Sequence, residues 1–136
     1  MEKIYSTREP ERLLFVIQRS NTFTGREDLT SAQEPLQVMS ISPEKDTVIP
    51  AHKHNPQDRV TKTTQEAIVV VKGKIESTLY DIDDTTILKT TILESGDCCI
   101  TLGGGHSHRI LEEGTQLYEC KNGPYNGPEK DKTNLK

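Results

Sequence analysis

Short runs of apolar and β-branched residues recur along the chain, and turn-forming residues separate them. In the second half of the chain, Gly73, Ser95 with Gly96, and Gly114 mark such turns. The runs predict strands over residues 12–19, 36–42, 64–72, 75–81, 87–93, 97–102, 106–111 and 116–121. Many short strands spaced about 8–12 residues apart are typical of a β-sandwich or β-barrel. We therefore predict an all-β fold.

Two segments lack this pattern. Residues 21–34 are polar and predict a loop or a short helical turn, inside an N-terminal strand and loop region that spans residues 1–35. Residues 124–136 contain two prolines and predict a polar C-terminal tail. No repeat or linker divides the chain, so we expect a single domain over residues 1–136.

The strand predicted over residues 64–72 is apolar on both faces. Because side chains alternate along a strand, the residues fall into two sets. One set is Glu66, Ile68 and Val70, and the other is Ala67, Val69 and Val71. A strand exposed on one face would carry polar residues there, so the second set needs a cover. That cover is either a second sheet or another subunit.

Composition supports strands and excludes two kinds of partner. The chain has three alanines but 11 Ile, 7 Val and 16 Thr, which favours strands over helices. Its formal net charge of −4 and its lack of Trp argue against nucleic acid as a partner. No stretch approaches the ~20 apolar residues of a membrane span, and no signal peptide is recognisable. We therefore expect a cytoplasmic protein with no membrane partner, whose three cysteines stay reduced.

All four histidines lie in two pairs, His52 with His54 and His106 with His108. Residues two apart in a strand project from the same face, so each pair is able to converge on one ion. Imidazole together with a carboxylate suits Fe, Mn, Zn, Ni or Cu. The sequence therefore predicts one divalent transition metal ion as a cofactor.

The surroundings of these histidines resemble the two motifs of the cupin superfamily. His52-Lys53-His54, followed by Glu66 and Gly73, resembles the first motif, with residues 55–64 forming an enlarged loop. Gly96-Asp97 leading to the run Gly103-Gly104-Gly105-His106 resembles the second. Residues 48–132 are also similar to small uncharacterised bacterial cupins, which are often encountered near saccharide biosynthesis functions.

The resemblance implies a double-stranded β-helix, also called a jelly roll or cupin barrel. It implies a metal shell of His52, His54, Glu66 and one histidine of the second pair. The general motif points to His108 as this last ligand and the narrower similarity to His106. We favour His106, with His108 free on the same face as a catalytic proton donor or acceptor. Cupins are commonly dimeric through an outer sheet face, so we also expect a homodimer.

The substrate and the reaction are predicted only by class. A small polar or sugar-like metabolite is the expected ligand, with Arg59, Tyr80 and Tyr118 as candidate substrate-binding residues. One hypothesis is a metal-dependent isomerase, epimerase or oxygenase. The alternative is a metal-stabilised module that binds or senses a saccharide without changing it.

Overall fold

A computed structural model describes residues 1–135, and strands dominate it. The strands are β1 (Glu2–Tyr5), β2 (Leu13–Gln18), β3 (Gly25–Asp28), β4 (Met39–Ser42), β5 (Glu66–Lys72), β6 (Lys74–Tyr80), β7 (Ile87–Glu94), β8 (Cys98–Thr101), β9 (His106–Ile110) and β10 (Gln116–Lys121). Within the described residues a single short helix, α1 (Pro128–Asp131), follows the last strand. The predicted all-β class is therefore confirmed.

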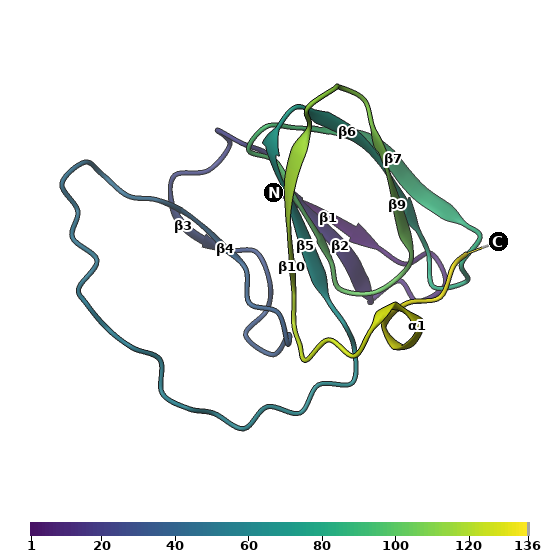
Figure 1. Cartoon of the computed structure of the whole chain (residues 1–136), viewed down its shortest axis with the longest axis horizontal. Coiled ribbons are helices and arrows are strands. Elements are labelled where there is room, and N and C mark those ends of the chain that lie inside the picture. The colour runs from purple at the N-terminus through teal and green to yellow at the C-terminus, as the bar shows by residue number, and fades with distance from the viewer. Residues whose placement is uncertain (136) are drawn as a thin grey trace.

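The strands form three antiparallel sheets. The largest has the order β1-β2-β8-β5-β10, the second has the order β7-β6-β9, and β3 pairs only with β4. Figure 1 shows the three-stranded sheet beside the five-stranded one, with β3 and β4 to one side. Each sheet has two free edges, so none of the sheets in residues 1–135 is closed into a barrel.

The main core lies between the five-stranded and the three-stranded sheets. It contains fully buried side chains from both, including Phe15 and Val70 from one sheet and Ile75, Leu79 and Leu93 from the other. The sequence of β6 explains this arrangement, because every second residue is apolar or small and turns inward. Burying these side chains between two layers is the main contribution to folding.

A second apolar cluster covers the outer face of the five-stranded sheet. Leu29 is buried there against Ala67 and Ile100, and Leu36 and Val38 pack on the same cluster. The chain itself thus supplies part of the cover that the sequence required. The cover is incomplete, because Val71 remains 43% exposed. The homodimer stays a prediction.

The observed strands follow the predicted ones except near the N-terminus. Residues 21–34 were expected to form a loop or a helical turn, but β3 lies within them. Residues 36–42 form a strand only from Met39 onward. β1 and β3 are short and largely exposed, and backbone pairing rather than an apolar face defines them. The predicted polar C-terminal tail contains the short helix α1.

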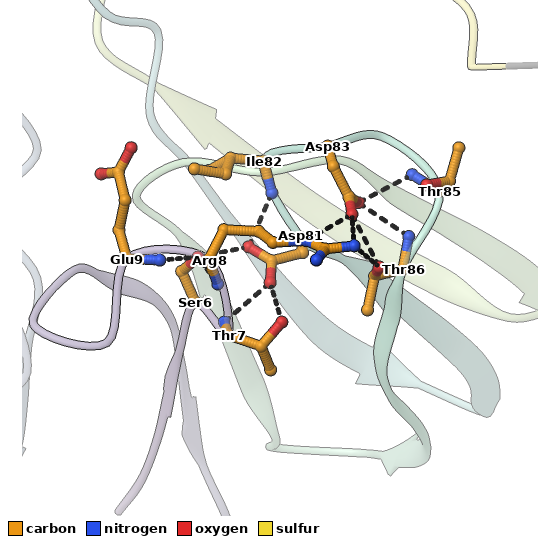
Figure 2. Close-up of polar contacts among 9 residues, drawn as sticks. All are labelled: Ser6, Thr7, Arg8, Glu9, Asp81, Ile82, Asp83, Thr85 and Thr86. Carbon is orange, nitrogen blue, oxygen red and sulfur yellow. Dashed lines mark hydrogen bonds and ion pairs between the residues drawn. The ribbon is translucent and has the colours of Figure 1, made fainter.

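A buried carboxylate fixes the N-terminal segment to the end of β6. Asp81 accepts hydrogen bonds from Ser6 Oγ at 2.5 Å, from the Thr7 backbone nitrogen at 2.7 Å and from the Ile82 nitrogen at 2.8 Å (Figure 2). Burial alone would raise the pKa of Asp81, but these hydrogen bonds outweigh it and hold the pKa far below its ordinary value. Asp81 is therefore an ionised structural group.

The turn after β6 is fixed in the same way. Asp83 accepts hydrogen bonds from the Thr86 backbone nitrogen at 2.8 Å and from Arg8 Nε at 2.8 Å (Figure 2). These contacts join the segment after β1 to the hairpin that carries Ser77, a residue of the candidate site. In the part of the chain that the structure covers, we find no helix both long and apolar enough to cross a membrane.

Candidate metal centre

Sheet register brings three potential ligands together. Glu66 begins β5, and His106 begins β9. β9 pairs with β6, so that His106 lies opposite Leu79 and His108 lies opposite Ser77. Leu79 and Ser77 face the core, and the two histidines project from the same face as one another. The two layers thus place both imidazoles against the carboxylate at the start of β5.

Glu66, His106 and His108 form a compact group. Each offers one ligand atom, and the three atoms lie within 4.8 Å of one another. Nε2 of His106 lies 3.2 Å from Oε1 of Glu66, and the two imidazole centroids are 5.2 Å apart. Two imidazoles and a carboxylate are a ligand set that divalent transition metals accept. This group fits the metal predicted from the sequence.

Hydroxyl groups orient both imidazoles through their other nitrogen. Nδ1 of His108 lies 2.9 Å from Oγ of the fully buried Ser77, and Nδ1 of His106 lies 3.4 Å from Oγ1 of Thr101. Within the described residues, the buried Nε2 of His108 has no hydrogen-bond partner. A buried nitrogen without a partner is costly unless a ligand satisfies it. Nε2 of His108 is therefore available to bind an ion.

Local electrostatics favour the metal-binding forms of His108 and Glu66. Burial lowers the pKa of His108, because an imidazolium is poorly solvated there. Burial would raise the pKa of Glu66, but the hydrogen bond from His106 and the ammonium of Lys121 bring it below its ordinary value. A neutral imidazole and an ionised carboxylate are the forms that coordinate a metal.

Lys121 adds a cation beside the cluster. It ends β10 opposite Glu66, and its Nζ lies 3.6 Å from Oε2 of that residue. The same ammonium lies 2.8 Å from Glu119 and 3.2 Å from Asp131, and the hydrogen bond to Glu119 is the main reason that its pKa is raised. Three carboxylates against one ammonium leave an excess of negative charge, which a divalent cation offsets.

The first histidine pair lies elsewhere in this structure. His52, His54 and Arg59 are exposed in the irregular segment 43–63, which forms the long arc of Figure 1. The imidazole centroids of His52 and His54 are 5.5 Å apart, and Nδ1 of His52 lies 2.8 Å from the Pro50 carbonyl oxygen. The structure does not bring these three residues to Glu66.

The two tyrosines predicted to bind substrate lie in different places. Tyr118 is 67% exposed and projects from the face of β10 opposite to Lys121. Tyr80 is half-buried at the end of β6, and its backbone nitrogen donates a hydrogen bond to the Gly105 carbonyl at 2.8 Å. Tyr80 thus contacts the turn that leads to His106, but through its backbone.

Sequence reasoning missed Ser77, Thr101 and Lys121. Alternation along β6 places Ser77 on the inner face with Ile75 and Leu79, and this signal was open to detection. Alternation along β10 likewise places Lys121 on the same strand face as Leu117. The partner of each of these polar residues depends on sheet register, which the sequence pattern leaves open.

A polar hollow is lined by residues that lie next to Glu66 and Lys121 in the sequence. It measures about 190 Å³ and forms where residues 61–64 meet residues 122–126, just beyond the paired ends of β5 and β10. Asn122 connects the two segments, accepting a hydrogen bond from the Gln65 backbone nitrogen at 2.6 Å and donating one to the Thr63 carbonyl at 3.0 Å. The hydroxyl and amide groups that line the hollow suit a polar ligand.

Comparison with known proteins identifies a family but no activity. Curated proteins and solved structures contain no match to this chain. A family described as a domain of unknown function (DUF6016) matches residues 26–93, which is half of the chain and includes Glu66, His52 and His54. The chain belongs to this family of domains of unknown function, DUF6016.

Proposed function

We propose that this protein binds one divalent transition metal ion, Fe, Mn, Zn or Ni, through Glu66, His106 and His108. The observation that carries the proposal is the buried Nε2 of His108, which lacks a partner within the described residues and lies in a group that fits a metal. Here both histidines are ligands, whereas the sequence favoured His106 as the ligand and His108 as a free acid or base.

The fold and the first histidine pair belong to the same proposal. The two facing sheets are consistent with an incompletely closed double-stranded β-helix of the cupin type. We propose that His52 and His54 complete the ligand shell when residues 43–63 fold toward the cluster. Two features support this movement: the segment is exposed along its length, and it leads through Thr64 and Gln65 into Glu66.

We propose that the protein catalyses a reaction of the isomerase, epimerase or oxygenase type on a small polar or sugar-like metabolite. When bound, the metal ion acts as a Lewis acid toward a substrate oxygen. The residues of the chain hold and orient that centre: Ser77 and Thr101 fix the imidazoles, and Lys121 balances the charge of Glu66. The polar lining of the hollow near Asn122 supports a hydroxyl-rich ligand.

A metal titration of the purified protein tests the proposal. Protein without a polyhistidine tag is freed of metal by a chelator and supplied with Fe²⁺, Mn²⁺, Ni²⁺ or Zn²⁺, and the bound metal is measured by elemental analysis. We expect one equivalent of at least one metal in the native protein and loss of binding in His108→Ala and Glu66→Gln. Glu113→Gln, at an exposed glutamate outside the cluster, serves as the matched control for Glu66→Gln. Less than half an equivalent for all four metals contradicts the proposal.

The alternative function is a binding or sensing module that leaves its saccharide unchanged. The same polar hollow favours this candidate, since it offers hydrogen-bonding groups for a ligand. Thermal-shift screening of metal-loaded protein with sugars and sugar acids identifies a ligand, and mass spectrometry of that ligand after incubation separates the two functions. A changed ligand supports the enzyme, and a bound but unchanged ligand supports the module.

A further inference from the structure

The C-terminal segment, residues 124–135, crosses the end of the two layers at which Glu66 and His106 lie. Lys121 ends β10 opposite Glu66, and the chain then continues through α1. Figure 1 shows α1 and the residues after it passing from the end of β10 toward the three-stranded sheet. The segment is therefore placed where it covers the candidate metal centre.

The first contact that holds the segment runs through Lys121. Its ammonium lies 3.2 Å from Asp131 of α1 and 3.6 Å from Glu66. The aspartate side chain is only 14% exposed, so the ion pair is partly shielded from water. The Tyr125 ring adds a contact, with its centroid 5.6 Å from the same ammonium. One cation thus joins the segment to a proposed metal ligand.

The second contact lies beside His106. Leu135 packs so closely on Gly105 that a methyl group added to this glycine would overlap the leucine side chain. Gly105 directly precedes His106 and has an ordinary backbone conformation, so its lack of a side chain serves the contact rather than a turn. Leu135 therefore covers the start of β9 at the candidate site.

Within residues 1–135, few other contacts secure the segment. α1 has four residues and buries none of them. A segment with few buried apolar contacts opens at low free energy compared with the core of the same protein. With the segment in place, the side chains of Glu66 and His106 are only 12% and 27% exposed. Opening would uncover them.

We propose that residues 124–135 form a lid over the Glu66, His106 and His108 cluster, latched by the Lys121–Asp131 ion pair and by Leu135 against Gly105. Ions and small ligands reach the cluster when the lid opens. The role in ligand entry rests on the proposed function, whereas the covering of His106 does not depend on it.

The test measures how fast diethyl pyrocarbonate modifies each histidine in the metal-free full-length protein, with mass spectrometry to locate the modification. Asp131→Asn removes the ionic latch, Leu135→Ala weakens the apolar one, and a double variant removes both. Glu129→Gln is the matched control, because it changes the same charge on the same exposed helix. His52 and His54 are exposed and act as references within each molecule.

We expect Asp131→Asn to raise the His106 rate about two- to fivefold, the factor that a partly shielded ion pair contributes. The double variant raises it further, and Glu129→Gln and the reference histidines stay unchanged. If the double variant loses its far-UV circular dichroism, the two single variants decide the question. A His106 rate in both single variants equal to that of Glu129→Gln overturns the lid.

A second measurement separates the lid from the metal site. The rate at which a chelator removes metal from the loaded protein should rise in Asp131→Asn by the same factor as the His106 labelling rate. Faster labelling in a protein that binds no metal supports the lid and refutes the proposed function. Metal binding with an unchanged labelling rate supports the function and refutes the lid.

Discussion

Replacing Gly104 with alanine tests whether the turn before His106 is as crowded as the structure shows. Gly104 has φ of +80°, which disfavours any residue with a side chain. Its added methyl group would lie 2.5 Å from the carbonyl oxygen of Tyr80 and 3.1 Å from Cζ of Phe15. Phe15 is fully buried, and the Tyr80 carbonyl belongs to the backbone, so neither is able to move without a cost.

The loss of stability has two parts. The left-handed conformation costs an alanine about 1–2 kcal/mol, and overpacking against a buried core costs about 1–3 kcal/mol more. We therefore expect Gly104→Ala to lower the free energy of unfolding by about 2–5 kcal/mol. Gly114→Ala is the matched control, because Gly114 has φ of +73° but open space around its Cα. The control should lose only the conformational part, about 1–2 kcal/mol.

Urea unfolding followed by far-UV circular dichroism measures both variants, since the chain has no Trp for fluorescence. With an m-value of about 2 kcal/mol per molar urea, the middle of the usual range, the expected difference of about 1–3 kcal/mol between the variants becomes a midpoint shift of roughly 0.5–1.5 M. Because the turn leads into His106, Gly104→Ala should also weaken metal binding more than the control. Equal midpoints for Gly104→Ala and Gly114→Ala would refute the reasoning.

Three further predictions concern other parts of the chain. At pH 8 a thiol reagent should modify only the exposed Cys120 in the native protein, because burial raises the pKa of Cys98 to about 11 and of Cys99 to about 12. In urea all three cysteines should react. Labelling of all three thiols in the native protein would contradict the burial of Cys98 and Cys99. The pKa of Asp81 is lower in the folded chain than in the unfolded one, so its stabilising effect is present above pH ~4 and disappears as the pH falls below that value. Asp81→Asn should therefore destabilise the protein at pH 7 and make urea midpoints measured between pH 5 and 2 fall less steeply than in the native chain, and parallel curves would contradict this role. Light scattering at tens of micromolar should show a dimer that Val71→Lys dissociates, whereas a monomeric native chain would exclude the predicted homodimer.

The fold was predictable where side-chain alternation defines a strand. In β6 the alternation of Ile75, Ser77 and Leu79 with more exposed neighbours fixes both the strand and its buried face. β3 was not predictable in this way, because Gly25 and its polar neighbours form a strand through backbone pairing with β4. The sequence pattern of such a segment does not differ from that of a loop.

The candidate site was predictable in part for a similar reason. The two-residue spacing of His106 and His108 determines that both project from one strand face, and the structure places both at Glu66. The same spacing in His52 and His54 does not fix their position, because residues 43–63 form no strand here. Lys121 was missed because its role depends on pairing with β5, a contact between residues 55 positions apart.

The most direct test of the central claim is the position of the metal in a crystal of metal-loaded protein. Anomalous scattering recorded at the absorption edge of the bound metal locates the ion independently of any assumed ligands. The account predicts one strong anomalous peak per chain, within coordinating distance of Glu66, His106 and His108, whether or not His52 and His54 join them. A peak elsewhere on the chain, with Nε2 of His108 facing no ion, would contradict it.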